Sequence, residues 1–352
     1  MTTLRKALNN RILVLDGAMG TMIQRQNLTE NDYRGERFAA WHTELKGNND
    51  LLSLTQPEII YNIHCQYLTA GADIIETNTF NAQRISMADY EMGDFVREIN
   101  LAAAKIARRA ADKFTAQNPE KQRFVVGSMG PTNKSLSLSP DAANPALRAI
   151  TFDELVSAYQ EQALALIDGG VDALLIETIF DTLNAKAAII AVQNAMNQEN
   201  KKVEIMFSAT VADVSGRLLA GQTIEAFLAS ISHAEPLSVG LNCSFGAKEM
   251  MPFLQELSSK SPFFVSAYPN AGLPNQLGQY DQTPEIMALQ VKDYIENQLV
   301  NIIGGCCGTT PEHIAAFQNI LKQREKTIDK RQTKEKSKDL ILSGLEILKI
   351  CK

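Results

Sequence analysis

Three cysteines toward the C-terminal end of the chain lie in two short glycine-containing segments. Cys243 lies in Gly240-Leu-Asn-Cys-Ser-Phe-Gly246, and Cys306 and Cys307 are adjacent in Gly304-Gly-Cys-Cys-Gly-Thr-Thr-Pro311. Three cysteine thiolates can fill three corners of a zinc tetrahedron and leave the fourth open, as catalytic zinc sites do. If the two segments meet in the fold, they predict a zinc centre that can bind one further ligand.

Other interpretations of these cysteines stay open on the residues alone. All three could be packed thiols, and the 306–307 pair could be a vicinal redox switch. The histidines do not compete as ligands. His233 and His313 lie in helical patterns, and His42 and His64 fall outside both cysteine segments.

Three carboxylates follow apolar segments, where an ionised group is costly unless it is paired. They are Asp16, Glu76 and Glu177. They could receive a cationic substrate group such as an amino acid's ammonium, or they could cap the next helix or pair with Arg or Lys. Gly17 and Gly20 could present backbone N–H groups to a substrate carboxylate, or they could serve ordinary turns.

The elements that must position these residues alternate along the chain. Short β-branched apolar runs are separated by longer stretches of helical periodicity, which indicates a parallel sheet. Eight such units favour a closed (β/α)₈ TIM barrel with its active site at the C-terminal ends of the strands; an open doubly wound sheet is the alternative. The predicted strands are Ile12–Leu15, Asp73–Ile75, Phe124–Val126, Ala173–Ile176, Glu204–Ser208, Ser238–Leu241, Phe263–Ser266 and Asn301–Ile303.

In this register the polar strand ends all fall on one rim of the barrel. Cys243 follows the sixth strand and Cys306 and Cys307 follow the eighth. Neighbouring strands are about 4.8 Å apart, so these two strand ends lie about 10 Å apart. Loop residues could close that distance onto one metal ion.

Composition excludes several classes of function. The net charge is −6 and the chain carries no basic stripe, so we expect no nucleic-acid partner. No apolar run approaches the roughly 18 residues of a membrane span, and the N-terminus does not resemble a secretory signal. We therefore expect a cytoplasmic protein. Five cysteines in 352 residues are too few for a disulfide scaffold.

The sequence predicts three regions. Residues 1–323 form the barrel, with a long connection at 27–49 that crosses one of its faces. Residues 324–339 are almost wholly charged or polar and indicate a solvated linker. Residues 340–352 resume an apolar pattern, which we interpret as the start of a truncated following domain.

Several motifs carry a resemblance to a known family. They are Asp16-Gly-Ala-Met-Gly-Thr21, Gly71-Ala-Asp-Ile-Ile-Glu-Thr-Asn-Thr-Phe80, Gly240-Leu-Asn-Cys243, Pro269-Asn-Ala-Gly-Leu-Pro274 and Gly304-Gly-Cys-Cys-Gly-Thr-Thr-Pro311. In these motifs the chain resembles the homocysteine S-methyltransferases. In residues 34–38 and 46–50 it most closely resembles the homocysteine-binding module of cobalamin-dependent methionine synthases. The tail at 342–346 resembles the opening of the folate-binding barrel that follows that module.

The resemblance implies a (β/α)₈ barrel that binds zinc through Cys243, Cys306 and Cys307 and takes the sulfur of L-homocysteine as fourth ligand. It implies that the activated thiolate receives a methyl group from methylcobalamin to give methionine. The methylcobalamin is carried by a separate module of the same polypeptide, and a folate-binding module regenerates it. Donors such as betaine or S-methylmethionine are the alternative. A non-catalytic zinc or redox-sensing module is the alternative from a different class.

The resemblance also implies roles for other residues at the same rim. Asp16 and Glu177 are the candidates for the substrate ammonium, with the Gly17–Ala18 backbone near its carboxylate. Further substrate contacts are assigned to Glu76, Thr77 and Asn78, and the Asn270 amide oxygen is a possible zinc ligand without substrate. No catalytic residue is expected beyond the zinc site.

Overall fold

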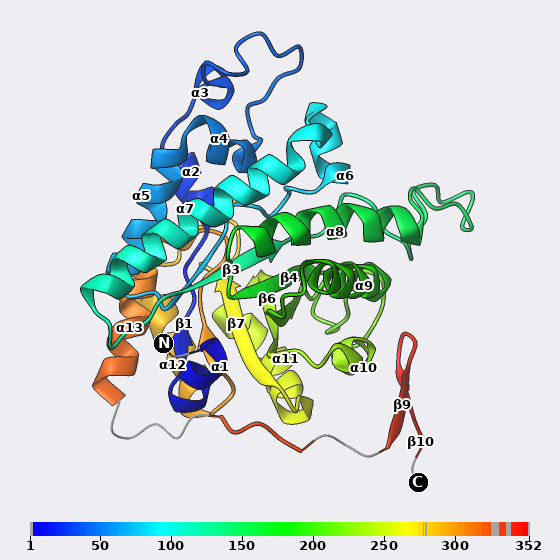
Figure 1. Ribbon diagram of the computed structural model, residues 1–352. Coiled ribbons are helices and arrows are strands. Elements are labelled where there is room, and N and C mark those ends of the chain that lie inside the picture. Colours follow the sequence, from blue (N-terminus) through cyan, green and yellow to red (C-terminus); the bar gives the residue numbers. More distant parts are fainter. Residues whose placement is uncertain (1–2, 277, 279, 325–330, 336–338, 351–352) are drawn as a thin grey trace.

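Eight parallel strands form the centre of the computed structural model (Figure 1), which describes residues 3–276, 278, 280–324, 331–335 and 339–350. Each strand coincides with one of the eight predicted apolar runs. The longer strands extend past the predicted ends, so that Glu177, Cys243 and Asn270 lie within strands. The strands are β1 (Leu13–Val14), β2 (Ile74–Glu76), β3 (Phe124–Met129), β4 (Ala173–Ile179), β5 (Glu204–Ala209), β6 (Ser238–Gly246), β7 (Phe264–Asn270) and β8 (Ile302–Ile303).

The sheet is a nearly closed barrel. The strands pair in the order β1-β8-β7-β6-β5-β4-β3-β2. The two ends of this order meet where Leu15 bridges Ile74 in parallel register and the Asp16 amide donates to the Ile74 carbonyl at 3.0 Å. An open doubly wound sheet would leave these edges apart, so the barrel prediction is confirmed and the open-sheet alternative is wrong.

A ring of helices surrounds the barrel, one after each strand (Figure 1). Consecutive helices pack against each other, and the last contacts the first to close the ring. None of the described helices is both long and apolar enough to cross a membrane. The ring helices are α5 (Pro57–Ala70), α7 (Val96–Gln117), α8 (Phe152–Asp168), α9 (Thr182–Glu199), α10 (Ile224–Ile231), α11 (Ala247–Lys260), α12 (Pro284–Glu296) and α13 (Pro311–Arg324).

Local signals explain where these helices begin and end. The Thr151 side chain accepts the Glu154 amide, and the Glu154 carboxylate accepts the Thr151 amide, so a capping box starts α8. Helix α5 ends where Gly71 takes a left-handed conformation with φ of 110°. After Gly71 the chain reverses direction and enters β2.

The barrel interior changes from apolar to polar along the strands. Because side chains alternate across a strand, every second residue points inward. The inward apolar cluster, with a short N-terminal helix against it, includes Leu13, Leu15, Ile74, Phe124, Val126, Leu175, Met206, Phe264, Tyr268 and Ile302. Two residues beyond Ile74, Val126, Leu175 and Met206 the inward positions hold Glu76, Ser128, Glu177 and Ser208. These inward side chains therefore form a polar layer at the C-terminal end of the barrel.

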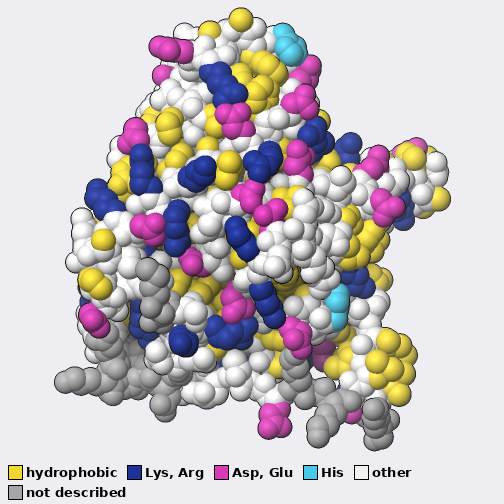
Figure 2. Space-filling model, viewed as in Figure 1, with side chains coloured by type: hydrophobic (Ala, Val, Ile, Leu, Met, Phe, Trp, Pro, Cys, Tyr) yellow, Lys and Arg dark blue, Asp and Glu magenta, His cyan; other side chains and the backbone are white. Residues whose placement is uncertain are grey.

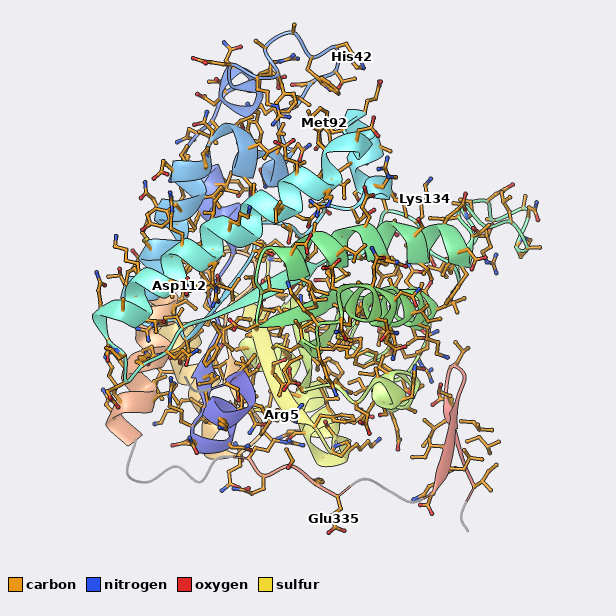
Figure 3. All side chains as sticks on the ribbon, viewed as in Figure 1. Arg5, His42, Met92, Asp112, Lys134 and Glu335 are labelled. Atoms are coloured by element: carbon orange, nitrogen blue, oxygen red, sulfur yellow. The ribbon has the colours of Figure 1, made fainter. Side chains whose placement is uncertain are left out.

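The predicted excursion after β1 folds as a small helical extension, in α2 (Met19–Gln24), α3 (Glu30–Arg34) and α4 (Leu52–Thr55). It packs on the segment that follows β2: the Phe38 ring meets Phe95 edge-on at 5.1 Å, and the Trp41 indole donates to the Tyr90 carbonyl at 3.1 Å. Figure 3 shows His42 at the outer tip of this extension, on the opposite side of the molecule from Glu335.

The described residues after α13 lie on the other side of the molecule. Residues 325–330 and 336–338 of the predicted linker lie outside the described residues, as do 351–352. Within the described part, Arg331 is buried against the end of α11. A hairpin of β9 (Leu340–Ser343) and β10 (Ile347–Ile350) then rests on α10, where the Thr223 amide donates to the Leu345 carbonyl at 3.0 Å. Figure 2 shows apolar side chains gathered at this hairpin.

Candidate metal centre and substrate cavity

The sulfur atoms of Cys243, Cys306 and Cys307 all lie within 4.8 Å of one another. The Cys243–Cys307 separation is 3.7 Å and the Cys306–Cys307 separation is 4.0 Å. Zinc with three sulfurs at about 2.3 Å in tetrahedral geometry holds them about 3.8 Å apart. Among the described residues, this is the one group of three or more His, Cys, Asp or Glu ligands that meets at such distances.

A bulge in β6 brings Cys243 over the barrel mouth. The pairing of β6 with β7 shifts register between Asn242 and Gly246. Cys243 and Ser244 take left-handed backbone angles, with φ of 61° and 59°. Such angles cost roughly 1–3 kcal/mol each in residues other than glycine and concentrate at functional sites. The fold therefore maintains strain at the residue that supplies one thiol.

The segment that contains Cys306 and Cys307 is so closely packed that only glycine fits at three of its positions. A Cβ atom on Gly305 would lie 2.5 Å from the Thr309 hydroxyl oxygen, and one on Gly308 would lie 2.2 Å from the Tyr280 Cβ. Gly304 is equally confined by Leu15. The glycines flanking the cysteine pair are thus required by packing, which places the pair against the neighbouring strand end.

Backbone hydrogen bonds fix the cysteine pair to the end of β7. The Cys306 amide donates to the Pro269 carbonyl at 2.8 Å, and the Ala271 amide donates to the Cys307 carbonyl at 2.9 Å. Hydrogen bonds from the Cys243 and Cys306 thiols lower the pKa of Cys307. Contacts with the other two thiols and burial raise the pKa of Cys306. The Cys306 contact lowers the pKa of Cys243, but the Cys307 contact and burial raise it above its ordinary value, so the cluster by itself favours one thiolate, at Cys307. The thiolate is the form that binds metal.

Asp16, Glu76 and Glu177 meet in the polar layer beneath the cysteines. Burial raises the pKa of all three carboxyls, and the pKa of Glu177 reaches about 7. Repulsion from Glu177 raises the pKa of Asp16 and Glu76 further. Glu177 accepts hydrogen bonds from the Ser128 hydroxyl and, at 3.3 Å, from the Tyr268 hydroxyl.

Within the described residues, none of these three carboxyls has an ion pair with Lys or Arg, and none caps a helix. Asp16 accepts the Glu76 amide at 3.1 Å. The Glu76 Oε1 atom is buried without a hydrogen-bond partner. The structure thus removes the two structural alternatives for these carboxylates and leaves a buried acidic cluster that a ligand cation would relieve.

The other predicted substrate residues border the same space but are already engaged. The Ala18 amide donates to the Thr309 hydroxyl at 3.2 Å, and a Cβ on Gly17 would meet that hydroxyl at 2.8 Å. The Thr77 hydroxyl accepts the Ser128 amide at 3.0 Å, and the Asn78 amide group donates to the Asn49 carbonyl at 2.7 Å. Thr77 therefore joins the end of β2 to β3, and Asn78 joins it to the excursion after β1.

Asn270 ends β7 beside the cysteine pair. It is 1% exposed, and its Oδ1 atom has no hydrogen-bond partner among the described residues. A buried amide oxygen without a donor is costly. The atom is therefore a candidate acceptor or ligand at this end of the barrel.

The cysteines and the carboxyls line a single cavity of about 750 Å³. It also includes Gly17, Ala18, Thr77 and Asn78, so the structure brings together all the predicted site residues apart from Asn270, which lies next to the lining. Thiol ligands at one side and unpaired acids at the other can bind a molecule that carries both a thiol and an ammonium group.

Comparisons with known proteins agree with this geometry. The family model of homocysteine S-methyltransferase matches residues 13–321. The chain belongs to the homocysteine S-methyltransferase family. It is therefore a methyltransferase, and the cavity at the C-terminal ends of its strands is its candidate active site.

Solved structures share the fold of this methyltransferase. The metallated form of the homocysteine methyltransferase MmuM from Escherichia coli is 24% identical, with a TM-score of 0.68, and the match covers 90% of this chain and 99% of that one. The oxidized form is 23% identical with a TM-score of 0.69 and coverages of 90% and 98%. The apo form is 23% identical with a TM-score of 0.62, and the match covers 88% of this chain and 95% of that one.

Among the further residues of the methyltransferase that line the cavity are three with ionisable side chains that were missed from the sequence. They are Arg25, Asp50 and Tyr280. Asp50 is buried, accepts the Asn81 amide at 3.1 Å, and has a pKa raised by burial to about 7. The sequence singled out the 46–50 segment that contains Asp50. Periodicity alone does not predict that the excursion after β1 folds over the barrel mouth, which is what brings Asp50 to the cavity.

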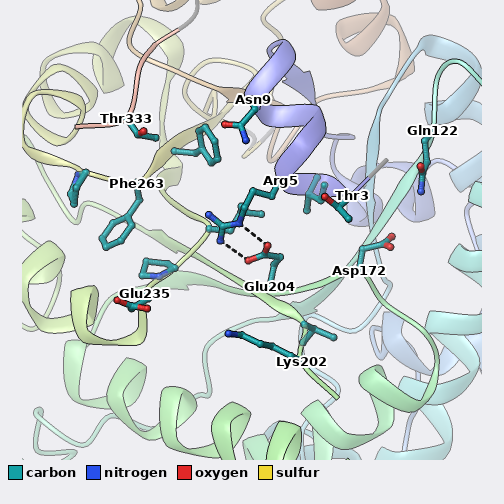
Figure 4. A pocket seen from close by; sticks show the side chains of 16 residues that line it. Thr3, Arg5, Asn9, Gln122, Asp172, Lys202, Glu204, Glu235, Phe263 and Thr333 are labelled. Atoms are coloured by element: carbon teal, nitrogen blue, oxygen red, sulfur yellow. Dashed lines mark hydrogen bonds and ion pairs between the residues drawn. The ribbon is translucent and has the colours of Figure 1, made fainter. Parts of the chain in front are cut away.

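A second, larger cavity of about 970 Å³ lies at the opposite end of the barrel (Figure 4). It surrounds the residues where β5 and β7 begin, and the Arg5–Glu204 ion pair crosses it at 2.7 Å. It contains no cysteine. In barrel enzymes the N-terminal face serves stability, so we assign the chemistry of the methyltransferase to the cysteine end.

Proposed function

We propose that this methyltransferase binds L-homocysteine at a zinc ion held by Cys243, Cys306 and Cys307, and activates it as a thiolate. The observation that carries the proposal is the position of three sulfurs, spaced as zinc ligands are, in one cavity with three carboxyls that form no ion pair with any described Lys or Arg. A short amino acid with a thiol at one end and an ammonium group at the other could bind the metal through its sulfur and the carboxyls through its ammonium.

The donor set fits zinc. Sulfur separations of 3.7 and 4.0 Å agree with the tetrahedral value of about 3.8 Å. The unpartnered Oδ1 of Asn270 offers a neutral oxygen ligand for the fourth corner when substrate is absent. Zinc bound there would deprotonate the substrate thiol, whose ordinary pKa is about 8.5.

The acidic cluster orients the substrate. In this proposal the ammonium lies between Asp16 and Glu177, with Glu76 close by, since a cation there offsets the repulsion that raises their pKa values. The Gly17–Ala18 backbone lies near the substrate carboxylate. Thr77 and Asn78 fix the cavity wall through their hydrogen bonds to Ser128 and Asn49. Fixing both ends of the molecule presents its sulfur toward the open mouth.

The methyl group arrives from the solvent side of that mouth. The homocysteine sulfur gives up its proton on binding, and a new sulfur–carbon bond forms as the bond between the methyl carbon and the donor breaks. The donor keeps the electron pair of that bond. We propose methylcobalamin, presented by another module and regenerated through a folate-binding module. The resemblance of residues 34–38, 46–50 and 342–346 supports this donor over betaine or S-methylmethionine.

X-ray absorption at the zinc edge tests the proposal. Homocysteine should change the coordination from three sulfurs to four and release a proton, measured in weakly buffered solution. Coordination that stays at three sulfurs with saturating homocysteine would contradict the enzyme proposal and favour a zinc or redox-sensing role. Assays with methylcobalamin, betaine and S-methylmethionine then identify the donor.

A further inference from the structure

Asn242 links three strands at the rim of the barrel. Its side chain is 1% exposed. Its Oδ1 accepts the Thr178 amide at 3.1 Å and the Ser208 hydroxyl at 2.7 Å, and its Nδ2 donates to the Thr178 hydroxyl at 2.8 Å. One amide group thereby joins β4, β5 and β6 and makes a two-point contact with Thr178.

Two of the three strands joined in this way, β4 and β6, are irregular at the same level. Pairing of β4 with β5 shifts register between Ile176 and Ile179, and that of β6 with β7 shifts between Asn242 and Gly246. Within these irregular stretches Thr178 has φ of 54° and Cys243 has φ of 61°. A β-branched residue such as threonine seldom takes a left-handed angle. Such an angle persists where surrounding contacts over-determine it.

These contacts lie between the two halves of the site. Glu177, in the acidic cluster, immediately precedes Thr178, and Cys243, in the sulfur cluster, immediately follows Asn242. The two functional side chains therefore sit on backbone segments held together by the same amide. A shift of one segment moves the other through two hydrogen bonds.

We propose that Asn242 is a positioning residue that fixes Cys243 relative to Glu177, and so couples the metal site to the ammonium site. This inference rests on the proposed function for the identity of the two ligands. Asn242 touches neither ligand in this proposal. It acts by holding the left-handed turns at Thr178 and Cys243, and alanine has no group to replace it.

The test compares Asn242→Ala with a matched control, Ser208→Ala. Both residues are buried and are hydrogen-bonded to each other, but the Ser208 variant leaves both Thr178 links intact. Zinc affinity is measured by competition with a chelator, and homocysteine affinity by titration of the zinc-loaded protein. Loss of an outer-shell partner typically weakens metal binding 10–100-fold. We expect that loss in Asn242→Ala, with a larger loss for homocysteine, and a change below about threefold in Ser208→Ala.

A second pair of variants keeps the test decisive if Asn242→Ala does not fold. Thr178→Val removes the hydroxyl that accepts from Asn242 and keeps the side-chain shape, whereas Thr178→Ser keeps the hydroxyl. The Val variant should lose zinc affinity several-fold and the Ser variant should match the wild type. Circular dichroism reports whether each variant retains the barrel.

The outcomes separate this inference from the proposed function. If the wild type binds zinc and homocysteine while Asn242→Ala and Thr178→Val do so within threefold, the positioning role is overturned and the proposed function stands. If the wild type binds zinc but shows no homocysteine-dependent change, the proposed function fails and the coupling fails with it. Weakened zinc binding in the variants would then support positioning of the metal site alone.

Discussion

The sulfur atoms of Cys243 and Cys307 lie 3.7 Å apart although 64 residues separate the two cysteines in the chain. A bulge in β6 and a glycine-lined turn after β8 produce this approach, and backbone hydrogen bonds fix the turn to the end of β7. The ligand set is therefore arranged by the fold. A pre-arranged site loses less conformational freedom on binding metal than one that has to fold around it.

The first prediction concerns the cysteines. Cys306→Ser should lose stoichiometric zinc while the barrel stays folded, because strand pairing and helix packing do not depend on that sulfur. Zinc content by atomic emission and far-UV circular dichroism check both parts. Cys65→Ser is the control: Cys65 packs beside the core in α5, away from the cluster, so its variant should keep zinc. Full zinc in Cys306→Ser would show that the ligand assignment is wrong.

The sequence was sufficient to predict the barrel and the meeting of the cysteines. Alternating periodicity located all eight strands, and strand geometry placed Cys243, Cys306 and Cys307 on one rim. Local patterns did not reveal the bulges, since left-handed angles at Thr178 and Cys243 depend on contacts between strands. The same limit hid Asp50, which reaches the cavity only because the excursion folds back on the mouth.

The second prediction concerns recognition of the substrate ammonium. Glu177→Gln should weaken homocysteine binding 10–100-fold, because it removes the charge; a charged hydrogen bond contributes about 1.5–3 kcal/mol. The amide keeps one oxygen acceptor for the Ser128 or Tyr268 hydroxyl, and the other hydroxyl can rotate to accept from the new N–H group. The matched ligand is 4-mercaptobutanoate, which has the thiol and the carboxylate without the ammonium. Its affinity, measured by titration, should not fall in the variant. Equal losses for both ligands would argue against an ammonium contact at this carboxyl.

The third prediction concerns the stability cost of the acidic cluster. Burial and the nearby Glu177 raise the pKa of Glu76 above its usual range, so the folded state keeps a proton that the unfolded state releases. Stability is therefore lost as pH rises above about 4.3, the ordinary glutamate pKa. Glu76→Gln removes this cost. Its gain in unfolding free energy, measured by urea denaturation, should be near zero at pH 4.5 and largest at pH 8.

The fourth prediction uses two glycines with the same backbone constraint. Gly170 and Gly308 have φ of 86° and 81°, but a Cβ on Gly170 meets nothing within 4 Å whereas one on Gly308 meets the Tyr280 Cβ at 2.2 Å. Gly170→Ala should cost about 1–2 kcal/mol from the left-handed angle alone. Gly308→Ala adds a clash beside the sulfur cluster, so it should destabilise by about 1–3 kcal/mol more and lower zinc affinity as well. Thermal unfolding and zinc competition measure the two effects.

The last prediction concerns Arg331, which caps the C-terminal end of α11 from a distant part of the chain. Its guanidinium donates to the Ser258 hydroxyl at 2.9 Å and carbonyl at 3.0 Å, and to the Phe263 carbonyl at 2.7 Å. Burial lowers the pKa of Arg331 to about 10, so the group remains charged at neutral pH. A cation at a helix C-terminus is stabilised by the helix dipole and by carbonyls that lack helical partners.

Arg331→Met should therefore leave several buried acceptors without donors and destabilise the protein by about 2–5 kcal/mol. Lys334→Met is the control, because Lys334 is exposed and donates to the Ser259 carbonyl; surface changes of this kind cost within about 0.5 kcal/mol. Urea denaturation measures both variants. Limited proteolysis should also cut the 331–335 segment faster in Arg331→Met, since that residue anchors it to α11. If the two variants unfold at the same urea concentration, the segment is not anchored by the guanidinium, and the hairpin contacts with α10 must hold it instead.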